Sequence, residues 1–360
     1  MDNASDSTIS FDKDGYCNYC NDVLRRKDSE YHPDPDRTVL AELFDNIKEN
    51  CRNDPYDCIV GVSGGIDSSF ILKLGYDFGL RMLAVHLDDG MDNAVAVENL
   101  KKLSEKTGCE IASIRPDHDE YADILYSMFK ASVPTLAMAQ DNLIIKAIQD
   151  FGIEKNIKYS LDGSNFAHES ILERGDGINA MDRKFILAIQ KQFGTIPIVK
   201  TKFASLNDRY IKRNYFSSLK HLRPLNDIEY DLSSTISELE EFCDFRYYGG
   251  KHYESILTRF LQCYYLPVKF GIDKRKSHYS SLIMSGQISR EEALQKMEQP
   301  LYPSEELLQE DKRFIAEFIG ISLEELDRCI SLPPVNPRKY PHSVLNELAP
   351  VARKFRKFLE

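Results

Sequence analysis

The strongest chemical signal in this 360-residue chain is a short run of small and polar side chains between an apolar segment and a helix-like one. The run consists of Ser63, Gly64, Gly65, Ile66, Asp67, Ser68 and Ser69. The two glycines let the backbone turn tightly and approach an anion. The N–H groups that open the next helix, with the hydroxyls of Ser68 and Ser69, can then hold pyrophosphate oxygens. Asp67 is placed to orient the loop or a magnesium ion. The alternative is a glycine turn with a Ser or Asp helix cap, but the strand–turn–helix setting favours the anion site.

The elements around this run follow an alternating pattern. The sequence predicts strands over residues 57–62, 81–87, 109–114 and 158–161. It predicts helices over residues 39–51, 68–77 and 93–107, and a further helical region after residue 114 that ends at about residue 151. Alternating β and α units predict a parallel, doubly wound α/β sheet. After about residue 175 the alternation fades, and we expect a mainly helical region with helices over residues 233–242, 254–262, 305–318 and a basic amphipathic one over 343–359.

Two further loops follow predicted strands, at residues 86–90 and 162–165. Loops after parallel strands emerge at one edge of the sheet, where ligands bind in open α/β folds. Asp88 and Asp89 are suited to ribose hydroxyls or a metal, and Gly163 lets the backbone pass close to a nucleotide. The alternatives are solvated carboxylates and a simple turn.

The helical region contains a second group of candidate residues. Lys269, Lys274 and Arg275, followed by Lys276, form a basic cluster suited to phosphate binding, with a solvated charged face as the alternative. His252 and Glu254 are candidates for acid–base work or for a purely structural pair.

Composition restricts the partners. The chain has 46 basic against 57 acidic residues, a net charge of -11, which disfavours nucleic acids. No apolar run approaches the ~20 residues that span a bilayer, and residues 1–6 do not resemble a secretory signal, so we expect a cytoplasmic protein without membrane contact. The eight cysteines are expected to be thiols, not disulfides.

The Ser-Gly-Gly-x-Asp-Ser string of residues 63–68 resembles the PP-loop of the ATP pyrophosphatases, which include GMP, NAD and asparagine synthetases and several tRNA-modifying enzymes. The resemblance implies an adenine nucleotide alpha hydrolase-like sheet that uses ATP and Mg2+ and releases pyrophosphate. A substrate oxygen attacks the α-phosphate, and a nitrogen or sulfur nucleophile resolves the adenylated intermediate. The positions expected to bind the nucleotide are Ser63, Gly64, Gly65, Asp67, Ser68, Ser69, Asp88 and Gly163.

Four longer strings, at residues 249–255, 258–260, 269–275 and 285–293, resemble the N-acetyl sugar amidotransferases of surface-polysaccharide and flagellin-sugar pathways. The resemblance runs over residues 2–341. It implies conversion of an acetamido group of a nucleotide-activated N-acetyl sugar to acetamidino, by adenylation of the amide oxygen and attack of ammonia. Ammonia is then expected from a separate glutaminase resembling the HisH/HisF pair. Candidate sugars are CMP-linked nonulosonic acids of the pseudaminic or legionaminic type and UDP-linked diacetamido uronic acids.

Within this resemblance, the residues assigned to catalysis are Asp67, Lys274 and Arg275, and those assigned to substrate are His252, Glu254 and Lys269. The chain divides into an N-terminal Cys-containing appendage (1–36), a PP-loop ATP pyrophosphatase domain (37–175) and a mainly helical substrate-binding region (176–360). Two alternatives stay open. One is a tRNA-modifying PP-loop enzyme of the thiolation or lysidine type, and the other is a nucleotide-binding regulatory module without turnover.

Cys17 and Cys20 form a Cys-x-x-Cys after a glycine turn, which is half of a four-cysteine zinc site. In the amidotransferase family a second such motif commonly lies just upstream, and this sequence does not contain it. Three explanations stay open: a misassigned or truncated start, other ligands for Zn2+, or no zinc.

Overall fold

The computed structural model describes residues 6, 8–172, 178–207, 219–346 and 348. Its centre is a five-stranded sheet in the order β3-β2-β1-β4-β5, in which every pair of neighbours is parallel. The strands are β1 (Cys58–Val62), β2 (Met82–Leu87), β3 (Glu110–Ile114), β4 (Tyr159–Leu161) and β5 (Lys220–Leu222). The predicted parallel α/β fold is therefore confirmed. The sequence analysis missed β5, which pairs with β4 through the register Tyr159 to Lys220.

Helices cover both faces of the sheet, as parallel strands require. On one face, alternate side chains of β1 such as Val60 pack into a core with α2 (Thr38–Asn50), α3 (Ile66–Asp77), α4 (Ala94–Thr107) and α10 (Leu232–Cys243). On the other face, Ile59 and Val85 pack against Ala147 of α6 (Met138–Glu154). Strands β1, β2 and β4 are thus buried on both sides, whereas the edge strands β3 and β5 are partly exposed.

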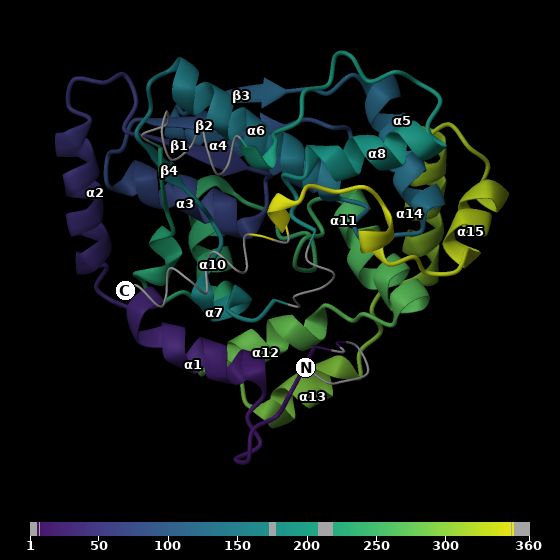
Figure 1. Cartoon of the computed structure of the whole chain (residues 1–360). Coiled ribbons are helices and arrows are strands. Elements are labelled where there is room, and N and C mark those ends of the chain that lie inside the picture. The colour runs from purple at the N-terminus through teal and green to yellow at the C-terminus, as the bar shows by residue number, and fades with distance from the viewer. Residues whose placement is uncertain (1–5, 7, 173–177, 208–218, 347, 349–360) are drawn as a thin grey trace.

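The remaining helices form two groups beside the sheet (Figure 1). One group shares a large core at the right of the view and consists of α5 (His118–Ala131), α8 (Arg183–Phe193), α11 (Ile256–Phe260), a π-helical stretch (Leu261–Phe270), α14 (Glu305–Phe318) and α15 (Leu323–Ser331). The other group lies at the bottom and consists of α1 (Asn18–Glu30), α7 (Phe166–Glu169), α12 (Arg275–Ser285) and α13 (Arg290–Met297). Two short 3-10 turns, Pro224–Asn226 and Pro337–Lys339, complete the elements.

Most predicted elements are present with ends shifted by one to three residues, and the helical region predicted up to residue 151 is two helices, α5 and α6. The sequence analysis did not predict α1. Most of the predicted helix over residues 343–359 lies outside the described residues. In the part of the chain that the structure describes, no helix is both long and apolar enough to cross a membrane.

Candidate active site

The turn between β1 and α3 has a geometry that requires glycine. Gly64 has φ of +73°, and a Cβ atom placed there would lie 2.9 Å from the carbonyl carbon of Ala96 and closer still to its oxygen. Ala96 belongs to the first turn of α4. An L side chain at Gly64 would therefore be strained in its backbone and would also overlap with a neighbouring helix.

The first turn of α3 is suited to an anion. Its N-cap is Gly65, which supplies no side-chain hydrogen bond, and the hydroxyl of Ser68 accepts from the N–H of Ser63 at 3.3 Å. The N–H of Ile66 donates to the hydroxyl of Tyr248 at 3.1 Å. Because no side-chain hydrogen bond caps this helix start, its N-terminal dipole can act on a bound phosphate, provided that a cation offsets the carboxylates of Asp67 in the same turn and of Glu254 beside Gly65. Ser69 is fully buried and does not line the cavities described below.

The loop after β4 meets this helix start. A Cβ atom at Gly163 would lie 3.1 Å from the backbone nitrogen of Ser68, so the absence of a side chain allows the two segments to touch. The loop after β2 does not reach this helix start. Its Asp88 forms an ion pair with Arg115, with a nitrogen–oxygen distance of 2.6 Å, and lines none of the three cavities described in the next paragraph. Its neighbour Asp89 is buried. The sheet edge thus brings Gly163, but not Asp88, to the turn of residues 63–69, which we call the PP-loop after the motif that it resembles.

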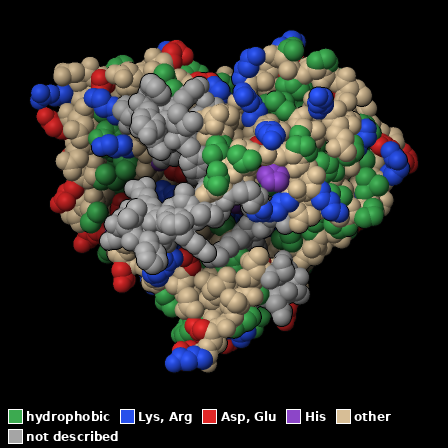
Figure 2. Space-filling view, viewed as in Figure 1, with side chains coloured by type: hydrophobic (Ala, Val, Ile, Leu, Met, Phe, Trp, Pro, Cys, Tyr) green, Lys and Arg blue, Asp and Glu red, His purple; other side chains and the backbone are tan. Residues whose placement is uncertain are grey.

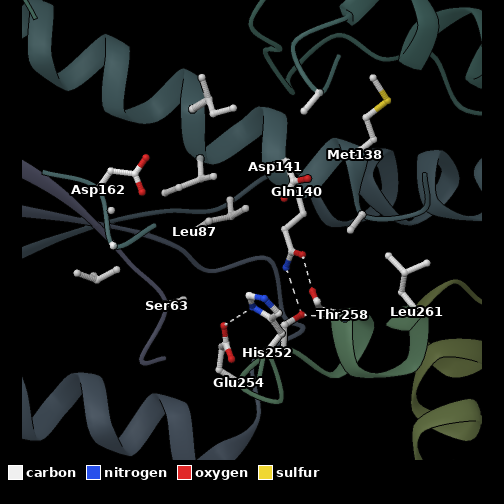
Figure 3. Close-up of a pocket in the computed structure, with 18 of the residues that line it drawn as sticks. Ser63, Leu87, Met138, Gln140, Asp141, Asp162, His252, Glu254, Thr258 and Leu261 are labelled. Atoms are coloured by element: carbon white, nitrogen blue, oxygen red, sulfur yellow. Dashed lines mark hydrogen bonds and ion pairs between the residues drawn. The ribbon is translucent and has the colours of Figure 1, made fainter. Parts of the chain in front are cut away.

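Two cavities are lined by residues of this turn, and a third adjoins them. The loop cavity, about 250 Å3, is lined by Ser63, Gly65, Asp67, Ser68 and Gly163 among others. The sheet-edge cavity, about 690 Å3, lies between the carboxyl ends of the strands, α6 and α11, and Figure 3 shows part of its lining. The helix cavity, about 770 Å3, lies against α12 and includes Lys274, Arg275 and Tyr279 in its wall. The side chain of His252 lines all three cavities.

Asp67 projects into the loop cavity and has two partners from the helical region. The hydroxyl of Tyr230 donates to its Oδ1, and Nζ of Lys251 lies 3.9 Å from its Oδ2. The same Nζ donates to Glu169 Oε1 at 2.8 Å. Burial disfavours the charge on Lys251, but the two carboxylates outweigh it and raise the pKa of this lysine. A permanent positive charge therefore lies beside the PP-loop, a role for Lys251 that the sequence analysis missed.

His252 and Glu254 also reach the PP-loop. His252 has φ of +64°, an unusual conformation for a residue with a side chain, and its Nδ1 lies 3.7 Å from Glu254 Oε1 (Figure 3). A Cβ atom at Gly65 would lie 3.0 Å from that carboxylate oxygen. Burial favours the neutral acid, yet His252 and the hydroxyl of Tyr248 outweigh it and lower the pKa of Glu254. The structure thus brings together Asp67, His252 and Glu254, three of the predicted residues.

Asp141 is a cavity residue that the sequence analysis did not single out. It lies in the first turn of α6 and lines the sheet-edge cavity opposite His252 and Glu254 (Figure 3). Neighbouring protein atoms disfavour its charged form and raise its pKa, while its side chain keeps contact with the solvent of the cavity. Its neighbour Gln140 donates to buried Asp89 at 2.9 Å. Asp141 could not be recognised from the sequence, because it faces His252 and Glu254 only once α6 and the segment around residue 252 are brought together by the fold.

The basic cluster of the sequence is divided in the structure. Lys269 Nζ donates to the carbonyl oxygens of Cys329, Ile330 and Leu332 at 3.0, 2.8 and 2.7 Å, which satisfies the end of α15. This contact gives Lys269 a structural role, and its binding of substrate stays a prediction. Lys274 and Arg275 instead line the helix cavity.

The structure gives zinc no support. Cys17 Sγ lies 3.2 Å from Cys20 Sγ and accepts from the N–H of Cys20, so it caps α1. Within the described ranges, no cluster of three or more His, Cys, Asp or Glu side chains could hold a metal ion. All eight cysteines are free thiols. Magnesium is a different case, because it binds through one or two carboxylates together with substrate phosphates, and Asp67 and Asp162 in the loop cavity fit that requirement.

One family model matches part of the chain. Residues 254–353 match the C-terminal domain of the WbpG-like lipopolysaccharide (LPS) biosynthesis proteins. This segment begins at Glu254, on the wall of the loop cavity, and includes α12. The C-terminal part of the chain is therefore similar to a lipopolysaccharide biosynthesis family. No curated protein matches the chain.

Several solved structures are distantly similar. The NMN synthetase from Francisella tularensis has a TM-score of 0.38 at 14% identity, with 82% of this chain and 95% of that chain covered. The NH3-dependent NAD synthetase from Campylobacter jejuni subsp. jejuni has a TM-score of 0.35 at 16% identity, with 82% and 97% covered. The U34-tRNA thiolase NcsA from Methanococcus maripaludis has a TM-score of 0.35 at 12% identity, with 77% and 79% covered. At these values the similarities assign no function.

Proposed function

We propose that this protein is an ATP-dependent amidotransferase that converts the acetamido group of a nucleotide-activated N-acetyl sugar to acetamidino. The observation that carries the proposal is the contact between the PP-loop and the segment of residues 249–255. Lys251 Nζ bridges Asp67 and Glu169, and His252 and Glu254 line the same cavity as Ser68. The match of residues 254–353 to a lipopolysaccharide biosynthesis family supports a sugar as the acceptor.

An amide oxygen is a poor leaving group, so the proposed reaction first activates it with ATP. The acetamido oxygen attacks the α-phosphorus of ATP, and the bond to pyrophosphate breaks. Ammonia then adds to the activated carbon and loses a proton, and the C–O bond breaks to release AMP. The sugar thus exchanges oxygen for NH, and one ATP becomes AMP and pyrophosphate.

The side chains of the loop cavity suit the first step. In our proposal the N-terminal N–H groups of α3 and the hydroxyl of Ser68 bind the pyrophosphate that departs, and Lys251 neutralises charge that develops on it. Mg2+ bound by Asp67 and the phosphates would stabilise the same charge. Tyr230 holds the Asp67 carboxylate in place.

The acidic lining of the sheet-edge cavity suits the second step. Asp92, Asp141 and Glu254 face this space, and the pKa of Asp141 is raised. A carboxylate at this place can accept the proton that the attacking nitrogen loses. Ammonia would come from a separate glutaminase of the HisH/HisF type, which an ammonium salt replaces in vitro.

The test is a mass-spectrometric screen with ATP, Mg2+, an ammonium salt and a panel of CMP- and UDP-linked N-acetyl sugars. We expect ammonium-dependent AMP release together with a sugar in which one oxygen is replaced by NH. AMP release that requires tRNA, with no change in any sugar, would overturn the proposal in favour of an RNA-modifying enzyme.

A further inference from the structure

We propose that His278, on α12, is a neutral hydrogen-bond acceptor that contacts the N–H of the acetamido group while the amide oxygen is adenylated. This inference rests on the proposed function, because it names a residue that recognises the acceptor of that reaction. It is carried by three observations: the contact that fixes the proton on the His278 ring, the second ring nitrogen, which has no partner among the described residues, and the place of the ring in the wall of the loop cavity.

A backbone contact fixes which nitrogen of His278 carries the proton. Nδ1 of His278 lies 3.2 Å from the carbonyl oxygen of His168, in the short helix α7. A carbonyl oxygen can only accept a hydrogen bond, so Nδ1 is the donor. In a neutral imidazole the other nitrogen, Nε2, then carries a lone pair. His278 therefore offers a hydrogen-bond acceptor at Nε2.

The groups around His278 keep its ring neutral. Burial disfavours a positive charge there, and the ammonium group of Lys251 and the imidazoles of His168 and His252 add to this effect. Together they outweigh the contact with the carbonyl oxygen and lower the pKa of His278. The ring of His168 meets that of His278 edge to face, with the ring centroids 5.6 Å apart. The lone pair on Nε2 is therefore available at neutral pH.

The second nitrogen of the ring is accessible. Within the described ranges Nε2 of His278 has no hydrogen-bond partner, because the hydrogen bond of this ring is made by Nδ1. Nε2 is not enclosed by protein either, since the described side-chain nitrogen and oxygen atoms that are both buried and unpartnered belong to other residues. The ring lines the loop cavity and the helix cavity, which share this part of their walls. A ligand in this space can therefore donate to Nε2.

The loop cavity is where the reacting amide must lie. The amide oxygen has to approach the α-phosphorus to within ~3–3.5 Å, and the α-phosphate is bonded to the pyrophosphate that the PP-loop binds in our proposal. His278 lines the same cavity as Asp67 and Ser68. This cavity is small, about 250 Å3, so a ligand inside it lies close to the walls. Figure 2 shows a hollow near the centre of one face of the molecule, which opens the interior to solvent.

The other acceptors in the described wall of this cavity are less suited to an amide N–H. They include four carboxylates, each of which already interacts with a group of the protein: Asp67 with Tyr230, Asp162 with the N–H of Ser164, Glu169 with Lys251, and Glu254 with His252. A carboxylate also repels the phosphates of ATP unless a cation offsets it. The neutral ring of His278 accepts a hydrogen bond without adding negative charge.

The proposed contact becomes stronger during the reaction. When the amide oxygen attacks the α-phosphorus, the bond to pyrophosphate breaks, and the amide nitrogen gains positive charge while it keeps its hydrogen. Its N–H is then a stronger donor, so Nε2 of His278 stabilises the transition state more than the substrate. Ammonia adds to the activated carbon afterwards, and no proton has to pass to His278. An O-acetyl group has no such hydrogen and cannot make the contact.

The first experiment compares two substitutions that each keep one half of the hydrogen bonding of the ring. His278→Asn keeps a donor near Nδ1 but has no group at Nε2, whereas His278→Gln places an amide oxygen near Nε2. We expect His278→Asn to lower kcat/KM for the acceptor in ammonium-dependent AMP release about tenfold, with an unchanged KM for ATP, because one hydrogen bond is lost. His278→Gln should restore most of the activity. The control is His118→Asn, at an exposed position on α5 that lines none of the three cavities, and it should behave like the unmodified chain.

The second experiment needs no turnover. Calorimetry compares UDP-N-acetylglucosamine and CMP-N-acetylneuraminate with analogues in which acetoxy replaces acetamido, in the presence of the Mg2+ complex of a non-hydrolysable ATP analogue. The unmodified chain should bind at least one N-acetyl probe several-fold more tightly than its O-acetyl analogue, and His278→Asn should bind the two equally.

The inference is overturned if the unmodified chain prefers neither N-acetyl probe, or if the preference persists in His278→Asn. It is also overturned if His278→Gln loses as much activity as His278→Asn, or if His278→Asn raises the KM for ATP alone, which would place the contact on the nucleotide. A preference that disappears in His278→Asn, without ammonium-dependent turnover of any sugar, would contradict the proposed function alone. Turnover that His278→Asn leaves unchanged would contradict the role of His278 alone.

Discussion

Replacing Gly64 by alanine tests whether the PP-loop turn is shaped by backbone conformation, by close packing or by both. The position has φ of +73°, and a new Cβ would overlap with the carbonyl group of Ala96. Gly79, just after α3, offers a matched control. It has nearly the same φ, +72°, but a Cβ there would meet no atom within 4 Å.

The magnitudes follow from these two environments. A left-handed conformation costs an L residue about 1–2 kcal/mol, and this cost applies to both variants. Overlap with a packed backbone adds about 1–3 kcal/mol at Gly64 alone. The effect of alanine on the unfolded chain is the same at both positions and cancels in the comparison. We therefore expect Gly64→Ala to lower the free energy of unfolding by about 2–5 kcal/mol and Gly79→Ala by about 1–2 kcal/mol.

Urea denaturation followed by circular dichroism measures both free energies, and pyrophosphate release measures the proposed activity. Gly64→Ala should also lose pyrophosphate release under conditions where it is still folded, because the turn must move away from α4 to relieve the overlap. Gly79→Ala should keep the activity. Equal stability of the two variants, or full activity of Gly64→Ala, would refute the argument that the approach to Ala96 defines this turn.

Three further variants and one metal measurement test other contacts. Asp67→Ala should abolish AMP formation while circular dichroism stays unchanged, and normal turnover would refute its role. Glu120 accepts hydrogen bonds from the backbone N–H groups of residues 199–201, which outweigh burial and lower its pKa to about 2. Glu120→Gln should therefore cost ~3 kcal/mol of stability at pH 7, and the difference should vanish as the pH falls from about 4.5 to about 2; a loss that does not change with pH would contradict this. Lys269→Met should lower the melting temperature but leave the KM for the acceptor unchanged, whereas a raised KM would restore its predicted contact with substrate. Metal analysis of the purified chain should find substoichiometric zinc, and one equivalent would contradict the structure.

The sequence predicted those features of the fold and site that depend on neighbouring residues. The turn at Gly64 and the strand and helix on either side of it are predictable because the apolar runs and the glycines lie within about 20 residues. The convergence of Gly163 with this turn was also predictable, since loops after parallel strands share one edge of the sheet.

Features that depend on distant partners were not predictable. β5 is the tripeptide Lys220–Leu222, whose mostly polar side chains give no strand signal and whose conformation comes from pairing with β4. The sequence alone does not tell the roles of Lys251 and Lys269 apart. In the structure Lys251 lies between two carboxylates, whereas Lys269 donates hydrogen bonds to carbonyl oxygens at the end of α15. The helix α1 was missed because its stability comes from Tyr19 and Val23, which pack in a core with Phe166.

Strand β5 is synthesised well after its partner β4, and this order affects folding during synthesis. β4 pairs with β1 on one side, and within the described residues its other edge pairs with β5, which follows it in the chain by roughly 60 residues, or ~3–12 s of synthesis at ~5–20 residues per second. During that interval the nascent sheet presents an unpaired strand edge beside a buried apolar core, which is a template for pairing with another chain. Yield during expression should therefore depend more on chaperone supply and growth temperature than on the stability of the finished molecule.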